Sequence, residues 1–158
     1  MKTKDKTNVM RKLDKMKISY KEYDYSDTGA VSGLEVANAL GQEQRKVFKT
    51  LVTTGKSGIQ YVFMIPVAEE LDLKKAAKAV SEKSVEMLKA KDLLPLTGYI
   101  HGGCSPIGMK KAFPTVLHNT AKELDTIIFS GGKIGYQVEV ALADLYKVIK
   151  IHQEDVCK

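Results

Sequence analysis

The stretch Val47-Phe48-Lys49-Thr50-Leu51-Val52-Thr53 is rich in β-branched and aromatic residues and predicts a strand. Turn-forming residues Gly55 to Gly58 follow it, and Gln60 to Val67 has the composition of a second strand, so the segment predicts a β-hairpin. Strand alternation places Lys49 on the same face as its apolar neighbours two positions away. A lysine on an apolar face must reach solvent with its tip, pair with an acid, or face a cavity.

Helices and further strands are expected on both sides of this hairpin. The spacing of apolar residues predicts helices over residues 7–17, 72–80 and 142–149, the last of them terminal. Ser32 and Glu35 form an S-x-x-E capping box that begins another helix, and Gly41 is suited to end it. Short β-rich runs predict strands over 18–25, 97–101, 115–118, 126–130 and 136–140. The pattern over residues 84–96 does not decide between helix and strand.

This order of elements favours the α+β class. Strands outnumber helices, and hairpins alternate with single helices, unlike the regular βαβαβ order of a doubly wound sheet. The chain has no internal repeat, low-complexity tract or long linker, so we expect a single domain over residues 1–158 with a mixed sheet that could close on itself.

Composition excludes several classes of protein. The chain has 158 residues, of which 44% are hydrophobic and 28% charged, a balance typical of a globular domain and not of a disordered one. The longest apolar run, Tyr61 to Ala68, is far short of the roughly 20 residues of a membrane span. No secretory signal is readable, so a cytoplasmic protein is expected. The two cysteines, Cys104 and Cys157, are expected to be free thiols, and no metal-site motif is present.

Positive charge is concentrated at the N-terminus. The net charge is +6, and residues 1–17 carry seven basic groups against two acidic ones. A polyanion would therefore meet a local basic patch on a nearly neutral remainder. The alternative is that this segment is only a well-solvated terminus.

Two glycine-rich loops, residues 102–108 and 131–135, each follow a predicted strand. Glycines let backbone amides approach a ligand closely, so such loops can hold a phosphate or an oxyanion, or can simply be tight turns. Gly103 to Gly108 has P-loop spacing, but Met109 and Lys110 stand where Lys and Ser or Thr are required, which excludes a P-loop ATPase.

Protein nucleophiles are poorly supported. Ser105, His118 and Asp125 could make a triad, but no G-x-S-x-G elbow surrounds the serine. Cys104 could pair with His101 or His118 as a thiol and imidazole, or could ligate a metal with His101, although further ligands are missing.

Five motifs follow one another along the chain, namely Val47-Phe48-Lys49-Thr50-Leu51-Val52, Leu71-Asp72-Leu73-Lys74-Lys75, Thr97-Gly98-Tyr99, Gly102-Gly103-Cys104-Ser105-Pro106-Ile107-Gly108 and Ser130-Gly131-Gly132-Lys133. Together they resemble the YbaK/EbsC family of free-standing Cys-tRNA(Pro) deacylases, which is related to the editing domain of bacterial prolyl-tRNA synthetases. The resemblance extends from about residue 8 to 150.

The resemblance implies a mixed, barrel-like β-sheet flanked by helices and an enzyme that needs no metal or cofactor. Its implied reaction is hydrolysis of mischarged Cys-tRNA(Pro), and also Cys-tRNA(Cys), beside prolyl-tRNA synthetase, with the tRNA acceptor end in a cleft. It implies that Lys49 is the residue most needed for activity, and that Gly102 and Gly103 contact the aminoacyl ester through their backbone. Ser130 and Tyr20 are implied to line the pocket.

One position departs from the family. Gln137 stands where the family often has Asp, so a charge that could pair with the substrate ammonium is lost. The resemblance further implies that the thiol of the bound cysteine attacks its own ester. Two alternatives stay open: a deacylase for another aminoacyl-tRNA such as Ala-tRNA(Pro), and a non-catalytic module that binds RNA through its basic first helix.

Overall fold

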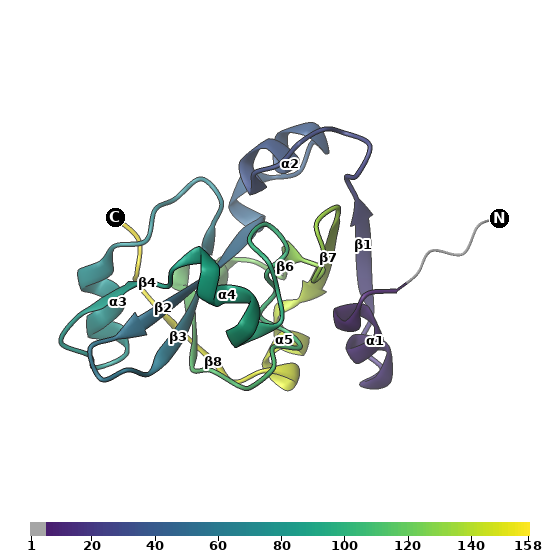
Figure 1. Ribbon diagram of the computed structural model, residues 1–158. Coiled ribbons are helices and arrows are strands. Elements are labelled where there is room, and N and C mark those ends of the chain that lie inside the picture. The colour runs from purple at the N-terminus through teal and green to yellow at the C-terminus, as the bar shows by residue number, and fades with distance from the viewer. Residues whose placement is uncertain (1–5) are drawn as a thin grey trace.

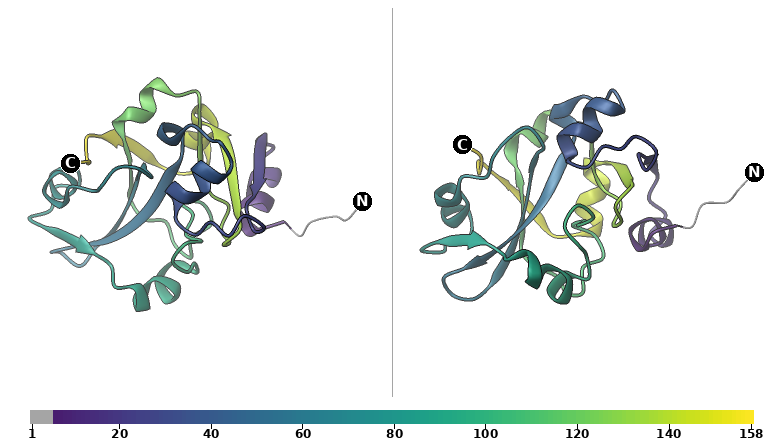
Figure 2. Two further views of the ribbon diagram at one scale, coloured as in Figure 1. Left: turned by 90° about the horizontal axis from the view of Figure 1, so that it is seen from above. Right: turned by 45° about the horizontal axis from the view of Figure 1, so that its top comes forward.

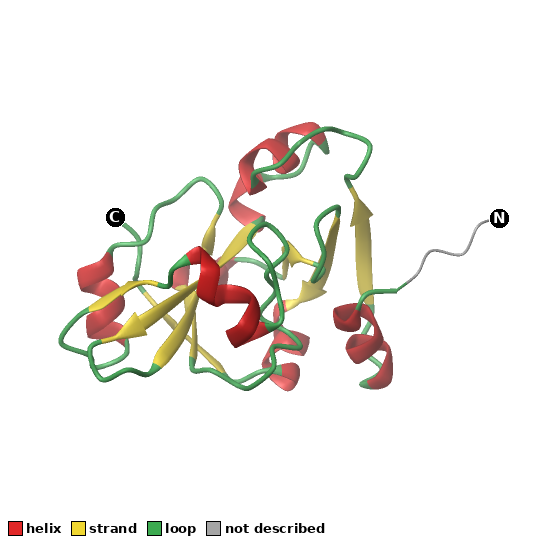
Figure 3. Ribbon diagram, viewed as in Figure 1, coloured by secondary structure: helices red, strands yellow, loops and turns green. Residues whose placement is uncertain are grey.

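The computed structural model describes residues 6–158, which fold into eight strands with helices around their outside (Figures 1 and 3). The helices are α1 (Asn8–Lys15), α2 (Gly33–Ala39), α3 (Leu73–Ala79), α4 (Ala90–Thr97) and α5 (Leu142–Val148), with 3-10 turns η1 (Gln44–Lys46) and η2 (Asn119–Glu123). The strands are β1 (Tyr20–Asp24), β2 (Phe48–Gly55), β3 (Gln60–Pro66), β4 (Val85–Met87), β5 (Thr115–His118), β6 (Thr126–Ser130), β7 (Tyr136–Ala141) and β8 (Ile151–Glu154). The predicted α+β class is confirmed. Residues 1–5 of the basic segment lie outside the described residues.

The strands form two sheets that face each other as the walls of a barrel (Figure 2). One is antiparallel with the order β1-β7-β6, and the other is mixed with the order β4-β2-β3-β5-β8. The β2–β3 hairpin is antiparallel, whereas β5 runs parallel to both β3 and β8. A parallel bridge between Val47 and Ile128 joins the two sheets at one seam. The barrel is therefore built from two sheets that meet at this point.

The β2–β3 hairpin separates two apolar cores, and strand alternation explains how. Phe48 and Val52 of β2 belong to the larger core, which fills the space between the two sheets. Phe63 and Ile65 of β3 belong to a smaller core on the other face, which α3 covers with Ala76 and its neighbours. Side chains of one strand thus alternate between the two cores.

One predicted strand was wrong, and one strand near the C-terminus was not predicted. Residues 97–101 do not form a strand, because Thr97 ends α4 and Gly98 follows in the left-handed conformation with φ 87°. The Thr97 hydroxyl accepts a hydrogen bond from the Tyr99 amide, 3.0 Å away, which closes this end of the helix. The first glycine loop therefore follows a helix. The chain also continues beyond the helix predicted as terminal, since β8 adds in parallel to β5.

The starts of α1 and α2 follow from local sequence. The Thr7 hydroxyl caps α1 by accepting from the Met10 amide, and the predicted capping box of Ser32 and Glu35 is present at α2. Gly41 follows α2 with φ +66°, as expected for the residue after a helix. Among the described residues, no helix is long and apolar enough to cross a membrane.

Candidate active site

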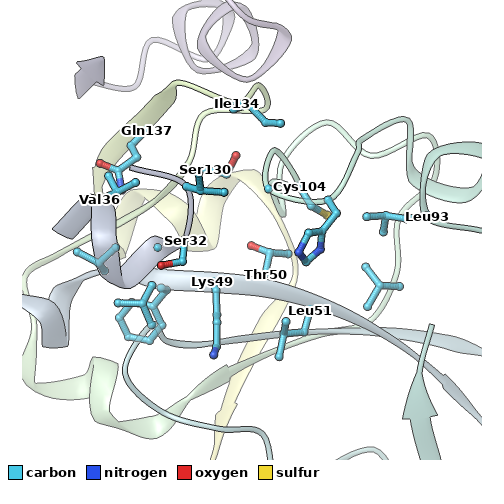
Figure 4. Close-up of a pocket in the computed structure, with 18 of the residues that line it drawn as sticks. Ser32, Val36, Lys49, Thr50, Leu51, Leu93, Cys104, Ser130, Ile134 and Gln137 are labelled. Carbon is cyan, nitrogen blue, oxygen red and sulfur yellow. The ribbon is translucent and has the colours of Figure 1, made fainter. Parts of the chain in front are cut away.

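A cavity of about 560 Å³ opens between β2, the start of α2 and the two glycine loops (Figure 4). It brings together four residues that the resemblance implied, namely Lys49, Gly102, Ser130 and Gln137. They come from three separate parts of the chain, so the fold assembles the site from distant segments.

The two glycine loops pack backbone against backbone at one wall of the cavity. A Cβ on Gly103 would lie 3.1 Å from the Ile134 amide nitrogen and 3.3 Å from the Lys133 carbonyl carbon. A side chain there would push the loops apart, so close approach is what requires glycine at position 103. Gly102 has φ +88°, a conformation that L-residues rarely adopt. The Tyr99 hydroxyl donates to the Ile107 carbonyl and fixes the rest of the first loop.

The two amides predicted to contact the ester differ in availability. The Gly103 amide already donates to the Ile100 carbonyl at 3.0 Å, within its own loop. The Gly102 amide has no hydrogen-bond acceptor among residues 6–158. Because Gly102 also lines the cavity, it is the better placed of the two to donate to a ligand oxygen.

Ser130 and Gln137, which pair across β6 and β7, line the opposite wall. The Ser130 hydroxyl oxygen accepts from the Gly132 amide at 3.1 Å, so its own hydrogen is free to donate. Gln137 is only 5% exposed, and its Oε1 accepts from Gln42 Nε2 at 2.8 Å. No aspartate or glutamate lines the cavity in the described part of the chain, so no carboxylate replaces the charge that Gln137 lacks.

Lys49 lies at the cavity but does not point toward the glycine loops. Its side chain extends from the face of β2 opposite to Thr50, whereas Thr50 points toward the side of Ser130 and Cys104 (Figure 4). Lys49 is half-buried, and its ammonium has no hydrogen bond or ion pair with any residue of 6–158. Burial, together with the negative charges of Glu69 and Asp155, raises the pKa of the Cys157 thiol to about 12, and the positive charge of Lys49 acts in the opposite direction.

Tyr20 is not at the cavity. It lies on β1 beside Lys6 and Asp14, in a separate surface depression. Among residues 6–158, the tyrosines that line the cavity are Tyr25 and Tyr136. Sequence alternation alone could not separate these tyrosines, because their positions depend on how β1 and β7 pair.

Cys104 lines the cavity but is poorly suited to act as a nucleophile. Its side chain is nearly buried, at 8% exposure, and burial raises the pKa of its thiol to about 12. A thiol with this pKa is almost entirely protonated near neutral pH, and the thiolate is the reactive form. Within residues 6–158, no group of three or more His, Cys, Asp or Glu side chains could hold a metal ion.

The serine triad considered from the sequence is not assembled. Ser105 is fully buried, and its hydroxyl oxygen accepts from the Ile107 amide at 3.4 Å. His118 Nδ1 accepts from the Val156 amide at 3.2 Å, near the C-terminus. Asp125 is exposed. The side chains of Ser105 and His118 are therefore both bonded to backbone amides and not to each other.

Sequence reasoning passed over Thr50, which lines the cavity beside the lysine it had singled out. The signal was available, since alternation puts Thr50 and Lys49 on opposite faces of one strand. No sequence pattern pointed to Gln42, because this residue lies 95 positions from its hydrogen-bond partner Gln137 in the sequence.

Comparison with known proteins places this site in a family. A family model described as an aminoacyl-tRNA editing domain matches residues 29–148. A protein of Enterococcus faecalis, named as a candidate Cys-tRNA(Pro)/Cys-tRNA(Cys) deacylase EbsC, is 52% identical over 141 residues, covering 89% of this chain and 86% of that protein.

Solved structures agree on the fold. A candidate trans-editing enzyme for prolyl-tRNA synthetase has a TM-score of 0.83 at 21% identity, with 98% of this chain and 99% of that one covered. The hypothetical protein APE2540 has a TM-score of 0.85 at 19% identity, with 95% and 99% covered. The family model covers both glycine loops and every cavity-lining residue except Tyr25, and the chain belongs to the aminoacyl-tRNA editing domain family.

Proposed function

We propose that this protein hydrolyses the ester of Cys-tRNA(Pro), and of Cys-tRNA(Cys), as a free-standing editing enzyme. Membership of the editing family and the name of the 52% identical relative support this substrate class. The observation that carries the proposal is the cavity itself, which has a free backbone amide at Gly102 and, in the described part of the chain, no activated protein nucleophile.

The substrate can supply the missing nucleophile. The cysteine sulfur attacks its own carbonyl carbon, the bond from that carbon to the ribose oxygen breaks, and the thiol proton passes to the leaving oxygen. The product is a four-membered thiolactone, which water then opens to free cysteine. Intramolecular attack in good geometry can reach an effective molarity of about 10⁵ M or more. The protein then needs only to hold the ester and stabilise the oxyanion.

Gly102 and Ser130 are the groups proposed for that purpose. The Gly102 amide would donate to the carbonyl oxygen as charge develops on it, and loss of one such donor typically costs about 10²–10³ in rate. Gly103 would keep the two loops in contact, since its own amide is already bonded. The Ser130 hydroxyl, with its hydrogen free, would bind the substrate beside Gln137.

Lys49 is proposed to bind the terminal adenosine through its phosphate or ribose. The side chain extends away from Thr50 and Ser130, so it is badly placed to act as a base at the ester (Figure 4). A half-buried ammonium with no acidic partner in the described chain suits a phosphate, which lies outside the ester pocket.

This route selects substrates by chemistry as well as by fit. Pocket fit alone separates small side chains by only about 10–200-fold. Serine is close in size to cysteine, but its hydroxyl is a much poorer nucleophile near neutral pH, and alanine and proline have none. Correctly charged Pro-tRNA(Pro) would therefore be spared.

The experiment is a deacylation panel with Cys-, Ala- and Ser-tRNA(Pro) and Cys-tRNA(Cys), each compared with its spontaneous hydrolysis. The proposal predicts rapid release of cysteine and little release of alanine or serine. Preferred release of alanine would instead establish an Ala-tRNA editor. Binding of tRNA with a steep salt dependence and no release would make the protein a non-catalytic RNA-binding module.

We further propose that the enzyme works in the cytoplasm beside prolyl-tRNA synthetase, which would supply the tRNA selectivity. No base-reading element is recognisable in the sequence. Co-purification of the two proteins with tRNA at low salt would support the partnership, and failure to co-purify under those conditions would contradict it.

A further inference from the structure

One buried side-chain oxygen at the cavity makes no hydrogen bond. Among residues 6–158, two buried side-chain polar atoms make no hydrogen bond, and they are Thr50 Oγ1 and Gln42 Oε1. Of these two residues, only Thr50 lines the cavity. The two serine hydroxyls of the lining differ in this respect, since Ser130 accepts from the Gly132 amide and Ser32 accepts from the Glu35 amide. A buried hydroxyl without a partner costs stability, so its retention indicates use by a ligand.

The register of β2 also directs the backbone N–H and C=O groups of Thr50 away from β3. The Val47 carbonyl accepts from Val67 at 2.9 Å and the Gly55 amide donates to Ile59 at 2.8 Å, so odd-numbered residues of β2 bond toward β3. In an antiparallel pair the even-numbered residues then direct their N–H and C=O groups to the other edge. At that edge β4 pairs with β2 from Thr53 onward, and the Leu88 amide donates to the Val52 carbonyl. On the other side of Thr50, the edge is paired only through the bridge between Val47 and Ile128.

Thr50 therefore offers the cavity a hydroxyl and an unpaired strand edge. The hydroxyl is screened from solvent, yet Thr50 as a whole is half-buried and no hydrogen bond holds its side chain in one rotamer. Rotation about the Cα–Cβ bond can turn the oxygen to a ligand at low cost. In Figure 4 this side chain lies on the same side of β2 as Ser130 and Cys104.

The chemistry of the wall decides which substrate group Thr50 would bind. An aminoacyl ester carries an α-amine, which needs hydrogen-bond acceptors. Residues 6–158 contribute no carboxylate to the cavity lining, and Gln137 already accepts from Gln42. A threonine hydroxyl has two acceptor lone pairs and its carbonyl has two more, whereas the Gly102 amide is a donor suited to the ester oxygen.

We propose that Thr50 forms the amino-group site of the pocket, with its hydroxyl and backbone carbonyl accepting hydrogen bonds from the substrate α-amine. This inference rests on the proposed deacylase function. It places the substrate amine at an uncharged site on β2. This site lies on the cavity wall opposite to Gln137, the position at which the family often has Asp.

The test compares two substrates and three variants. Cys-tRNA(Pro) is compared with 3-mercaptopropionyl-tRNA(Pro), which keeps the thiol and the ester but lacks the amine. Thr50→Val removes the hydroxyl while keeping the β-branched shape, Thr50→Ser keeps the hydroxyl, and Thr54→Val is the matched control on β2 outside the cavity lining.

We expect Thr50→Val to lower kcat/KM about tenfold or more for Cys-tRNA(Pro) and to leave the amine-free substrate within about twofold. Thr50→Ser and Thr54→Val should stay within about threefold on both substrates. The thermal midpoint of Thr50→Val should equal or exceed that of the wild type, because the unpaired hydroxyl is gone. If Thr50→Val does not fold, Thr50→Ala serves the same comparison.

Equal losses on the two substrates would overturn the assignment to the amine, and unchanged kinetics would overturn any role for the hydroxyl. Wild-type protein that releases cysteine from neither tRNA would remove the deacylase function and this inference with it. Release of cysteine by the wild type therefore distinguishes a wrong assignment of Thr50 from a wrong deacylase function.

Discussion

Lys46 Nζ lies 3.0 Å from Glu139 Oε2 and joins the segment before β2 to the middle strand of the three-stranded sheet. The same carboxylate accepts from the Tyr23 hydroxyl at 2.6 Å and from the Thr126 hydroxyl. Burial by itself raises the pKa of Glu139, but these three partners outweigh it and lower the pKa to about 2. The ion pair lies next to the seam between the sheets, so it helps hold the walls of the cavity together.

This pairing predicts a pH dependence of stability. The folded pKa of Glu139 lies below its unfolded value, so the stabilisation is complete above about pH 5 and is lost as the pH falls from about 4.5 toward 2. Glu139→Gln should lower the free energy of unfolding by about 2–3 kcal/mol at pH 7. Denaturant titrations of both proteins at several pH values should show this difference shrinking toward pH 2. A difference that stays constant with pH would contradict the assignment.

A second prediction concerns Gly102 and distinguishes the effect of its backbone conformation on stability from the effect of its amide on activity. Gly102 and Gly58 have similar φ values, +88° and +93°, and neither would meet a severe clash on gaining a Cβ. Gly102→Ala and Gly58→Ala should each lose about 1 kcal/mol of stability. Only Gly102→Ala should lose deacylation, by about 10–100-fold, since its Cβ would crowd the free amide. Equal activity in the two variants would argue against an amide donor at this loop.

A third prediction concerns the two thiols, which are both nearly buried and both have a pKa raised by burial to about 12. Cys104 lines the cavity and Cys157 lies in the smaller core. Cys104→Ala and Cys157→Ala should both retain cysteine release within a few-fold. Complete loss in Cys104→Ala alone, in protein that still melts cooperatively, would establish a protein thiol as the nucleophile.

The fourth prediction addresses Lys49. Lys49→Ala should raise KM for Cys-tRNA(Pro) and reduce the slope of log KM against log salt by about 1, as expected for one lost phosphate contact. Lys56→Ala, an exposed lysine in the β2–β3 turn, is the control and should change neither quantity. A pure kcat effect with unchanged salt dependence would place Lys49 in the chemical step instead.

The hairpin, the helix caps and most strands could be predicted from sequence because their signals are local. Alternation along β2, the capping box at Ser32 and the turn at Gly55–Gly58 each lie within a few residues of the element they define. The strand predicted at 97–101 was wrong because Gly98 and the Thr97 hydroxyl end a helix there, which overrides the β-rich composition.

The geometry of the site could be predicted only in part. Local motifs and the family resemblance selected Lys49, Gly102, Ser130 and Gln137, which do line one cavity. The Gly102 amide is free and the Gly103 amide is not, because the Gly103 amide donates a hydrogen bond to the Ile100 carbonyl within the turn. No sequence pattern specifies that hydrogen bond. The unpaired state of Thr50 depends on how far β4 extends along β2, a matter of long-range pairing.

The proposed mechanism depends most on the substrate supplying its own nucleophile. The direct measurement is the single-turnover rate of wild-type protein on cysteinyl- and seryl-tRNA(Pro), two esters that differ in one atom. Attack by the substrate thiol predicts that cysteine is released more than about 200-fold faster than serine, beyond what pocket fit alone provides. Similar rates for the two esters would show that water or a protein group performs the attack, and would contradict it.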